Sequence, residues 1–109
     1  MGKPNGNTLG SKSRSRSAKV PKALTINGER WTVVRANLAR RGLWGLCVHT
    51  KREIRLDSGL RGQELAETFL HEVLHACLPE RFNAKTEEKM VFRLAPRLLG
   101  ALQGIGWIR

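Results

Sequence analysis

The sequence predicts one α+β domain over residues 23–109, with a small antiparallel sheet of three or four strands followed by two helices. Short β-prone runs with alternating apolar residues occupy residues 24–57. Helical patterns occupy residues 61–78 and 85–102, and Pro79 separates them. The chain has 109 residues, 40% of them hydrophobic, which suffices for a single domain with a modest core.

The strands are predicted from turn signals and from alternation. LTINGERWTVV, residues 24–34, places Asn-Gly between two β-prone runs, a strong signal for a hairpin. Residues 35–43 form a polar connection with room for a short turn of helix. WGLCVHT (44–50) and EIRLD (53–57) are two further strands joined by a tight turn.

Each predicted helix has a feature that shapes it. The helix over residues 61–78 carries Glu64 and Glu67 early, where acids interact favourably with the helix dipole. The helix over residues 85–102 contains Pro96, which removes one backbone donor and clashes with the preceding turn. We therefore expect a kink in the second helix.

Residues 1–22 are predicted to form a disordered basic arm. They contain six Lys or Arg residues and no acid, and they have too little apolar area to offset the entropy of ordering. The net charge of the chain is +11, and residues 23–109 carry only +5 of it. The arm either contacts nucleic acid or another acidic surface, or serves as a solubilising tail.

Composition and the lack of a long apolar run indicate the cellular compartment in which the chain is expected. No apolar run reaches the length of about 18 residues that a membrane helix needs, and the basic N-terminus lacks the apolar segment of a secretory signal. Two cysteines are too few for a disulfide framework. A reduced, cytoplasmic location is therefore expected, without membrane contact, and the oligomeric state stays open.

The stretch TFLHEVLHACLPE, residues 68–80, says most about function. His71 and His75 are four residues apart on the polar side of the predicted helix, so their imidazoles can reach one metal ion. Glu72 points beside that ion, where it can take a proton from the attacking water. The alternative is a surface helix with two solvated histidines.

A third protein ligand has to be an acid, because no histidine follows His75. Glu80 lies too close to the end of the same helix to fold back. In the second helix, Glu87 is in line with an apolar stripe expected to face the core, whereas Glu88 lies about 100° away. The stripe consists of Val91, Leu94, Leu98, Ala101 and Ile105. Glu87 is therefore the predicted third zinc ligand, with Glu88 in reserve as a helix-start acid.

Two further residues are weaker candidates for the site. Cys77 lies in the apolar arc of the first helix, where a cysteine usually behaves as a small hydrophobe. His49 ends a predicted strand, and a surface position is the simpler interpretation. A histidine near a metal cleft can also donate to a developing oxyanion.

Residues 53–80 and 86–107, which include HEVLHA and RLAP, resemble small, mostly phage- and prophage-encoded zinc metallopeptidases of the zincin superfamily. The resemblance implies a minimal zincin-like fold in which an antiparallel sheet packs on the HExxH helix. It also carries over His71 and His75 as zinc ligands and Glu72 as general base. A peptide or protein substrate, Zn²⁺ as cofactor and a host cytoplasm for a phage protein are further implications.

Two functions follow as hypotheses. The first is a zinc-dependent peptidase, in which an extended peptide adds to the edge of the sheet. The second is a basic protein associated with nucleic acid, in which the metal site is structural or vestigial. The number of protein ligands distinguishes them, because structural zinc normally has four and catalytic zinc has three plus an open position.

Overall fold

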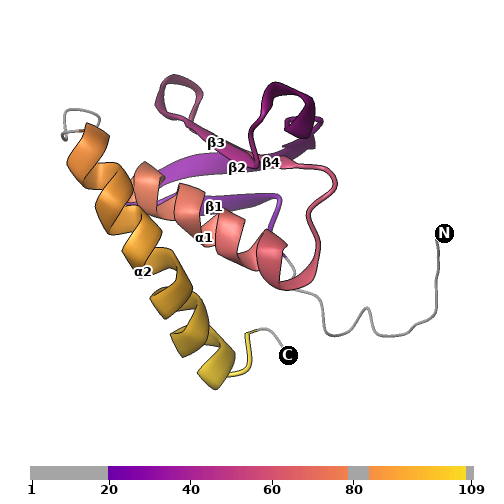
Figure 1. Ribbon diagram of the computed structural model, residues 1–109. Helices are drawn as coiled ribbons and strands as arrows, with labels where there is room; N and C mark the ends of the chain where they lie inside the picture. Colours follow the sequence, from indigo (N-terminus) through magenta and orange to yellow (C-terminus); the bar gives the residue numbers. More distant parts are fainter. Residues whose placement is uncertain (1–19, 79–83, 108–109) are drawn as a thin grey trace, which may run out of the picture.

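The structure, a computed structural model, describes residues 20–78 and 84–107. It confirms the α+β class: a four-stranded sheet lies against one helix, and a second helix packs on the first (Figure 1). The strands are β1 (Ala23–Ile26), β2 (Glu29–Ala36), β3 (Gly45–Val48) and β4 (Glu53–Asp57). The helices are α1 (Gly62–Cys77) and α2 (Ala84–Gly104), and two 3-10 turns are η3 (Ala39–Arg41) and η4 (His49–Lys51).

The predicted hairpin is confirmed. β1 and β2 pair antiparallel around Asn27 and Gly28, whose φ angles of 52° and 82° are both positive. Two positive φ angles define the turn type whose twist matches that of the flanking strands. Trp31 and Val33 alternate with exposed neighbours along β2 and enter the core.

The sheet is mixed, so the expectation of an antiparallel sheet was wrong. Its order is β1-β2-β4-β3, and β2 pairs parallel with β4. Residues 37–44 carry the chain past the place of β4 to the edge, and β4 then returns between β2 and β3. Ile54 and Leu56 in β4 have no exposed surface, which suits a central strand. Strand order depends on such contacts between segments that are distant in the sequence, so local sequence patterns do not predict it.

The sheet begins at the predicted domain boundary, with β1 starting at Ala23, but contacts with the domain extend into the preceding residues. The backbone N–H of Val33 donates to the carbonyl of Lys22 at 2.9 Å, and Val20 packs against the core. Val20 and Lys22, both assigned to the arm, therefore contact the domain. Residues 1–19 lie outside the described residues.

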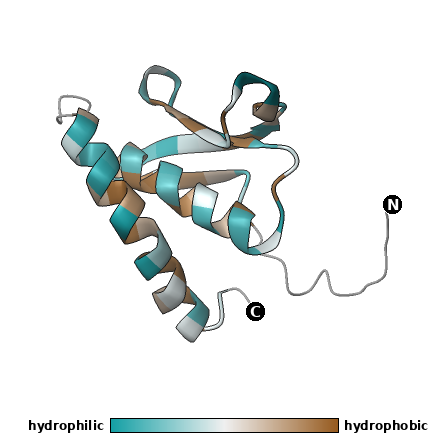
Figure 2. Ribbon diagram, viewed as in Figure 1, coloured by the Kyte–Doolittle hydropathy of each residue, from teal (hydrophilic) through white to brown (hydrophobic). Residues whose placement is uncertain are grey.

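The core-facing side of α2 differs from the predicted one. Val91, Ala95 and Leu99 are buried against α1 and the core, whereas much of the predicted stripe is exposed. The exposed members are Leu94 at 48%, Leu98 at 37%, Ile105 at 79% and also Ala101. Hydrophobic residues recur along α2 among hydrophilic ones (Figure 2). Ala95 is the middle one of the three buried residues of α2. The helix runs continuously through Pro96.

Asp57, at the end of β4, holds together the segments that lead to β3 and to α1. Its Oδ1 accepts hydrogen bonds from the backbone N–H groups of Leu38 and Ala39, at 2.9 and 2.7 Å. Its Oδ2 accepts one from Gly59 at 3.0 Å. The N–H groups of Ala39 and Gly59 lower the pKa of Asp57 and outweigh its burial, which acts in the opposite direction.

We expect Asp57→Asn to lower the melting temperature at pH 7, because an amide cannot accept at both ends. A carboxylate with a lowered native pKa stabilises the fold fully above its ordinary pKa of about 3.9. This contribution is lost as the pH falls through the native value, so the deficit of the variant should shrink in acid. Thermal unfolding between pH 7 and 3 measures it, with Glu29→Gln as an exposed control. An equal deficit at every pH contradicts this role.

No helix among the described residues is long and apolar enough to cross a membrane.

Candidate metal centre

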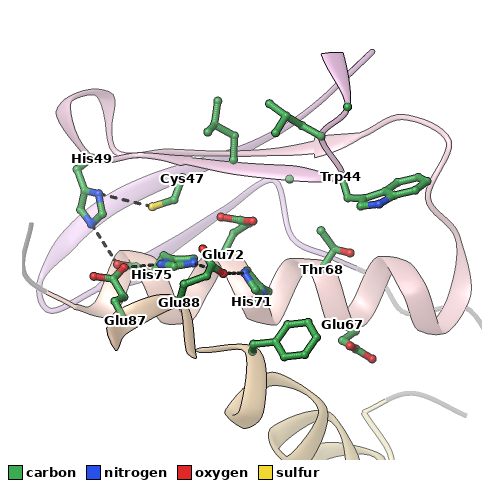
Figure 3. A pocket seen from close by; sticks show the side chains of 15 residues that line it. Trp44, Cys47, His49, Glu67, Thr68, His71, Glu72, His75, Glu87 and Glu88 are labelled. Atoms are coloured by element: carbon green, nitrogen blue, oxygen red, sulfur yellow. Dashed lines mark hydrogen bonds and ion pairs between the residues drawn. The ribbon is translucent and has the colours of Figure 1, made fainter. Parts of the chain in front are cut away.

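A pocket of about 640 Å³ lies between β3, α1 and the start of α2. β3 forms one wall and the polar side of α1 forms the floor, from which His71, Glu72 and His75 project (Figure 3). Glu87 and Glu88 enter it from the first turns of α2. The four residues predicted from the sequence to form the site are thus brought together, and so is the reserve acid Glu88.

Glu88 contacts both histidines of the HExxH pattern. Its Oε1 lies 2.8 Å from Nε2 of His71 and 3.4 Å from Nε2 of His75. The ring centroids of the two histidines are 5.0 Å apart, as expected for residues one helical turn apart. One donor atom from each of the three residues lies within 4.8 Å of the others, so this group can hold a metal ion.

The donor set suits zinc in type and in spacing. Zinc takes imidazole nitrogen and carboxylate oxygen at about 2.0–2.2 Å, which puts two tetrahedral ligands about 3.3–3.5 Å apart. The 3.4 Å separation of Glu88 from His75 already has this value, and the 2.8 Å separation from His71 needs a few tenths of an ångström more. Small side-chain rotations at the mouth of the pocket provide that adjustment, since the Glu88 side chain is 60% exposed.

Glu87 contacts the other nitrogen of His75. Its Oε2 meets Nδ1 of His75, and its side chain is only 12% exposed. Burial acts to lower the pKa of His75, but the hydrogen bond that His75 donates to Glu87 and the nearby carboxylates outweigh it and raise the pKa. A carboxylate on Nδ1 favours a proton on that nitrogen, so Nε2, which lies 3.4 Å from Oε1 of Glu88, is the nitrogen available to a metal ion.

The positions of the two glutamates follow from the buried side of α2. Glu88 precedes Val91, Ala95 and Leu99 by three, seven and eleven residues, so it shares their side of the helix. The sequence argument had centred the buried side on Leu94 and Leu98 and so favoured Glu87. Glu87 still turns inward at the helix start, but it reaches Nδ1 of His75. Glu80, the other acid considered, lies outside the described residues.

Glu72 lies at the closed side of the pocket, under β3. It is 7% exposed, although it is an acid on the otherwise polar side of α1. Burial raises its pKa to about 7; the charge of His75 opposes this and the carboxylate of Glu88 adds to it. A carboxyl group with a pKa near 7 can both accept and return a proton at neutral pH.

Gly45 allows β3 to approach α1 closely at this point. A Cβ atom at position 45 would lie 2.9 Å from Oε2 of Glu72 and 2.9 Å from Cγ2 of Thr68. Real Cβ atoms essentially never make contacts this short, so the side chains of Glu72 and Thr68 would have to shift to admit one. The sequence pattern shows Gly45 only as a residue within a strand, where a close backbone approach is one of the usual reasons for glycine.

Gly45→Ala should destabilise the domain by about 1–3 kcal/mol, the usual cost of overpacking. Gly100→Ala is the matched control, since a Cβ there meets nothing within 4 Å and the site is helical. That control should stabilise by about 0.5–1 kcal/mol through helix propensity. Urea denaturation of both variants measures the difference. Equal stability of Gly45→Ala and the wild type would show that the strand and helix are not in tight contact.

The two weaker candidates have different positions from those expected. Nε2 of His49 lies 3.1 Å from the carbonyl oxygen of His75, and the ring packs edge-on against Trp31. This nitrogen is therefore engaged in tying η4 to the end of α1, which does not favour a role at an oxyanion. Cys77 is exposed and does not line the pocket, so the expected burial was wrong.

Several residues that line the pocket were not predicted as site residues from the sequence, Glu67 among them. Gly45 and Thr68 form the contact beneath β3, and two aromatic side chains line the mouth. Trp44 is 63% exposed and Phe92 is 73% exposed, and both line the pocket. For Phe92 a signal existed, because it lies one helical turn after Glu88.

Comparison of the chain with protein-family models, with curated proteins and with solved structures finds no match.

Proposed function

We propose that the chain is a zinc-dependent hydrolase that cleaves peptide bonds in a peptide or protein substrate, with His71, His75 and Glu88 as the metal ligands. The observation that carries this proposal is the contact of one Glu88 oxygen with the Nε2 atoms of both histidines. Glu88 thus replaces Glu87 as the assigned third ligand. Glu87 orients His75 through Nδ1. The resemblance to zincin-type peptidases supports His71 and His75 as ligands and Glu72 as general base, and the choice of Glu88 rests on its contacts alone.

In the proposed reaction, the buried carboxyl group of Glu72 moves protons. Bound zinc supplies Lewis acidity, which polarises the scissile carbonyl and makes water more acidic. Glu72 takes the proton from the attacking water and returns it to the leaving amine. Its burial beneath β3 excludes bulk water from this exchange, and its pKa near 7 keeps both transfers accessible.

The edge strand β3 supports a peptide as the substrate. β3 is last in the sheet order, and its residues Gly45, Leu46 and Cys47 line the pocket. The carbonyl of Trp44 accepts the N–H of Asp57, so by antiparallel alternation the N–H and C=O of Gly45 point away from β4. An extended peptide that pairs with this edge would lie directly above Glu72.

The alternative function, a basic protein that binds nucleic acid, rests mainly on the positive charge of residues 1–22. Among the described residues, no lysine or arginine lines the pocket, whereas four glutamates do. Phosphate groups are bound by basic side chains and repelled by carboxylates. The pocket itself therefore favours the hydrolase.

Metal-dependent proteolysis tests the proposed function. The full chain, loaded with one equivalent of zinc, should cleave an unfolded protein mixture, and the fragments can be read by mass spectrometry. Removal of the metal with a chelator should stop cleavage, and zinc should restore it. Absence of new fragments from zinc-loaded protein, with zinc shown to be bound, would contradict the proposal.

A further inference from the structure

A second, smaller pocket of about 380 Å³ adjoins the metal centre. Its described lining is Trp44, Leu60, Glu64, Glu67 and Thr68, and three of these residues also line the larger pocket. In Figure 3, Trp44 lies above Thr68, at the end of the larger pocket away from His49. The two pockets therefore form one continuous cleft along α1.

Trp44 is largely exposed, so packing in the core does not account for a tryptophan at this position. Its side chain is 63% exposed, whereas Trp31 is 4% exposed in the core. Phe92, at 73%, is the other large exposed aromatic side chain among the described residues, and it lines the same cleft. Aromatic rings exposed at the wall of a cleft, and not scattered over the surface, are typical of a surface that contacts a ligand.

The charge of the cleft is opposite to that of the chain. Five of the nine acidic residues line the two pockets, and among the described residues no lysine or arginine does, in a chain of net charge +11. No described residue forms an ion pair with Glu64 or Glu67. A zinc ion at the histidines would neutralise the negative charge of the carboxylates beside it. Glu67 and Glu64 lie one and two helical turns before His71, so their charges are farther from the ion.

We propose that the pocket formed by Trp44, Glu64 and Glu67 binds a lysine or arginine side chain of the substrate. This inference rests on the proposed function. The aliphatic stem of such a side chain packs on an indole, its cation lies on the ring face, and the carboxylates neutralise it. A purely apolar side chain would cover the two carboxylates without pairing them, which is unfavourable. An acidic side chain would be repelled.

The spacing places this subsite a short way from the bond that is cut. Residues 64 and 67 precede His71 by seven and four positions, or about 10 and 6 Å along a helix axis. An extended peptide advances about 3.3 Å per residue. The preferred basic residue should therefore lie two or three positions from the scissile bond.

Peptide binding and peptide cleavage test the proposal separately. Peptides that differ at one position, with Arg, Lys, Leu or Glu, are titrated into zinc-loaded Glu72→Gln protein at 0.15 M salt, an ionic strength of about physiological value. The basic peptides should bind about tenfold more tightly than the leucine peptide. Glu67→Gln and Trp44→Leu, each added to this background, should reduce the preference to about twofold or less. Glu29→Gln, an exposed glutamate outside both pockets, should leave the preference unchanged.

The wild-type chain is then tested for cleavage of a mixed peptide library, and the residues that flank each cut are counted. Enrichment of Arg or Lys two or three positions from the cut supports the subsite. Cleavage without that enrichment, and binding without a basic preference, would overturn it while keeping the hydrolase. Preferential binding of basic peptides that depends on Trp44 and Glu67, without any cleavage by the wild type, supports the subsite and contradicts the proposed function.

Discussion

Glu72→Gln is expected to abolish peptide hydrolysis while zinc remains bound with nearly unchanged affinity. General-base groups contribute about 10²–10⁴-fold to rates, and an amide cannot accept the proton of the attacking water. Glutamine has the shape of the protonated carboxyl group, which the buried position beneath β3 already favours. The fold should therefore tolerate it, and the melting temperature should not fall.

Turnover of a peptide substrate and zinc titration of the same preparation measure the two effects. Glu29→Gln makes the same chemical change at an exposed position far from the pocket, so it should keep both zinc and activity. Retained turnover by zinc-loaded Glu72→Gln would remove Glu72 from the mechanism. Loss of zinc together with activity would show instead that Glu72 helps to bind the metal.

Glu88→Ala and Glu87→Ala should differ sharply in zinc affinity. The first removes the oxygen that contacts both Nε2 atoms, which leaves two histidines and an under-coordinated ion. We expect a loss of more than about 100-fold, which exceeds the range for a residue that only orients a ligand. The second removes the partner of Nδ1 of His75 and should cost about 10–100-fold.

Competition titrations against a zinc chelator measure both affinities at one pH. Glu88→Asp tests the length of the side chain at position 88, and Glu87→Gln tests whether position 87 needs a charged carboxylate. A shortened carboxylate at position 88 should recover little affinity, whereas an amide at position 87 still accepts from Nδ1–H and should recover much of it. The reverse order of the two alanine variants would return Glu87 to the role of third ligand.

Local features of the fold were predictable from the sequence, and non-local ones were not. Asn27-Gly28 predicts its hairpin because the turn needs two positive φ angles. The helical patterns over residues 61–78 and 85–102 predict the ends of α1 and α2 to within two residues. The place of β4 between β2 and β3 depends on contacts across the whole sheet. No nearest-neighbour pattern distinguishes this order from a simple meander.

The candidate site was predictable up to the choice between two adjacent glutamates. His71, Glu72 and His75 follow from spacing alone, because residues one turn apart share a helix face. The third position depended on which of two overlapping apolar stripes of α2 is buried. In the structure the side with Val91, Ala95 and Leu99 is buried, whereas hydrophobicity alone favours the side with Leu94 and Leu98.

The burial of Glu72 could not be inferred from its helix either. In a helical-wheel projection Glu72 lies beside the polar side of α1, which predicts exposure. In the structure it is buried, because β3 lies close to α1 at this point. That approach depends on Gly45, which lies 27 residues earlier in the chain. The aromatic rings of the cleft escaped notice for a similar reason, because Trp44 belongs to a strand pattern that predicts burial.

The central claim is that one zinc ion binds to His71, His75 and Glu88 and leaves a position open for water. Its most direct test is a crystal structure of the full chain with one equivalent of zinc, with anomalous diffraction recorded at the zinc edge. We predict one anomalous peak per chain, about 2.0–2.2 Å from Nε2 of both histidines and from one Glu88 oxygen, with a fourth ligand that is not protein. No peak between these three side chains, or a peak with four protein ligands, would contradict it.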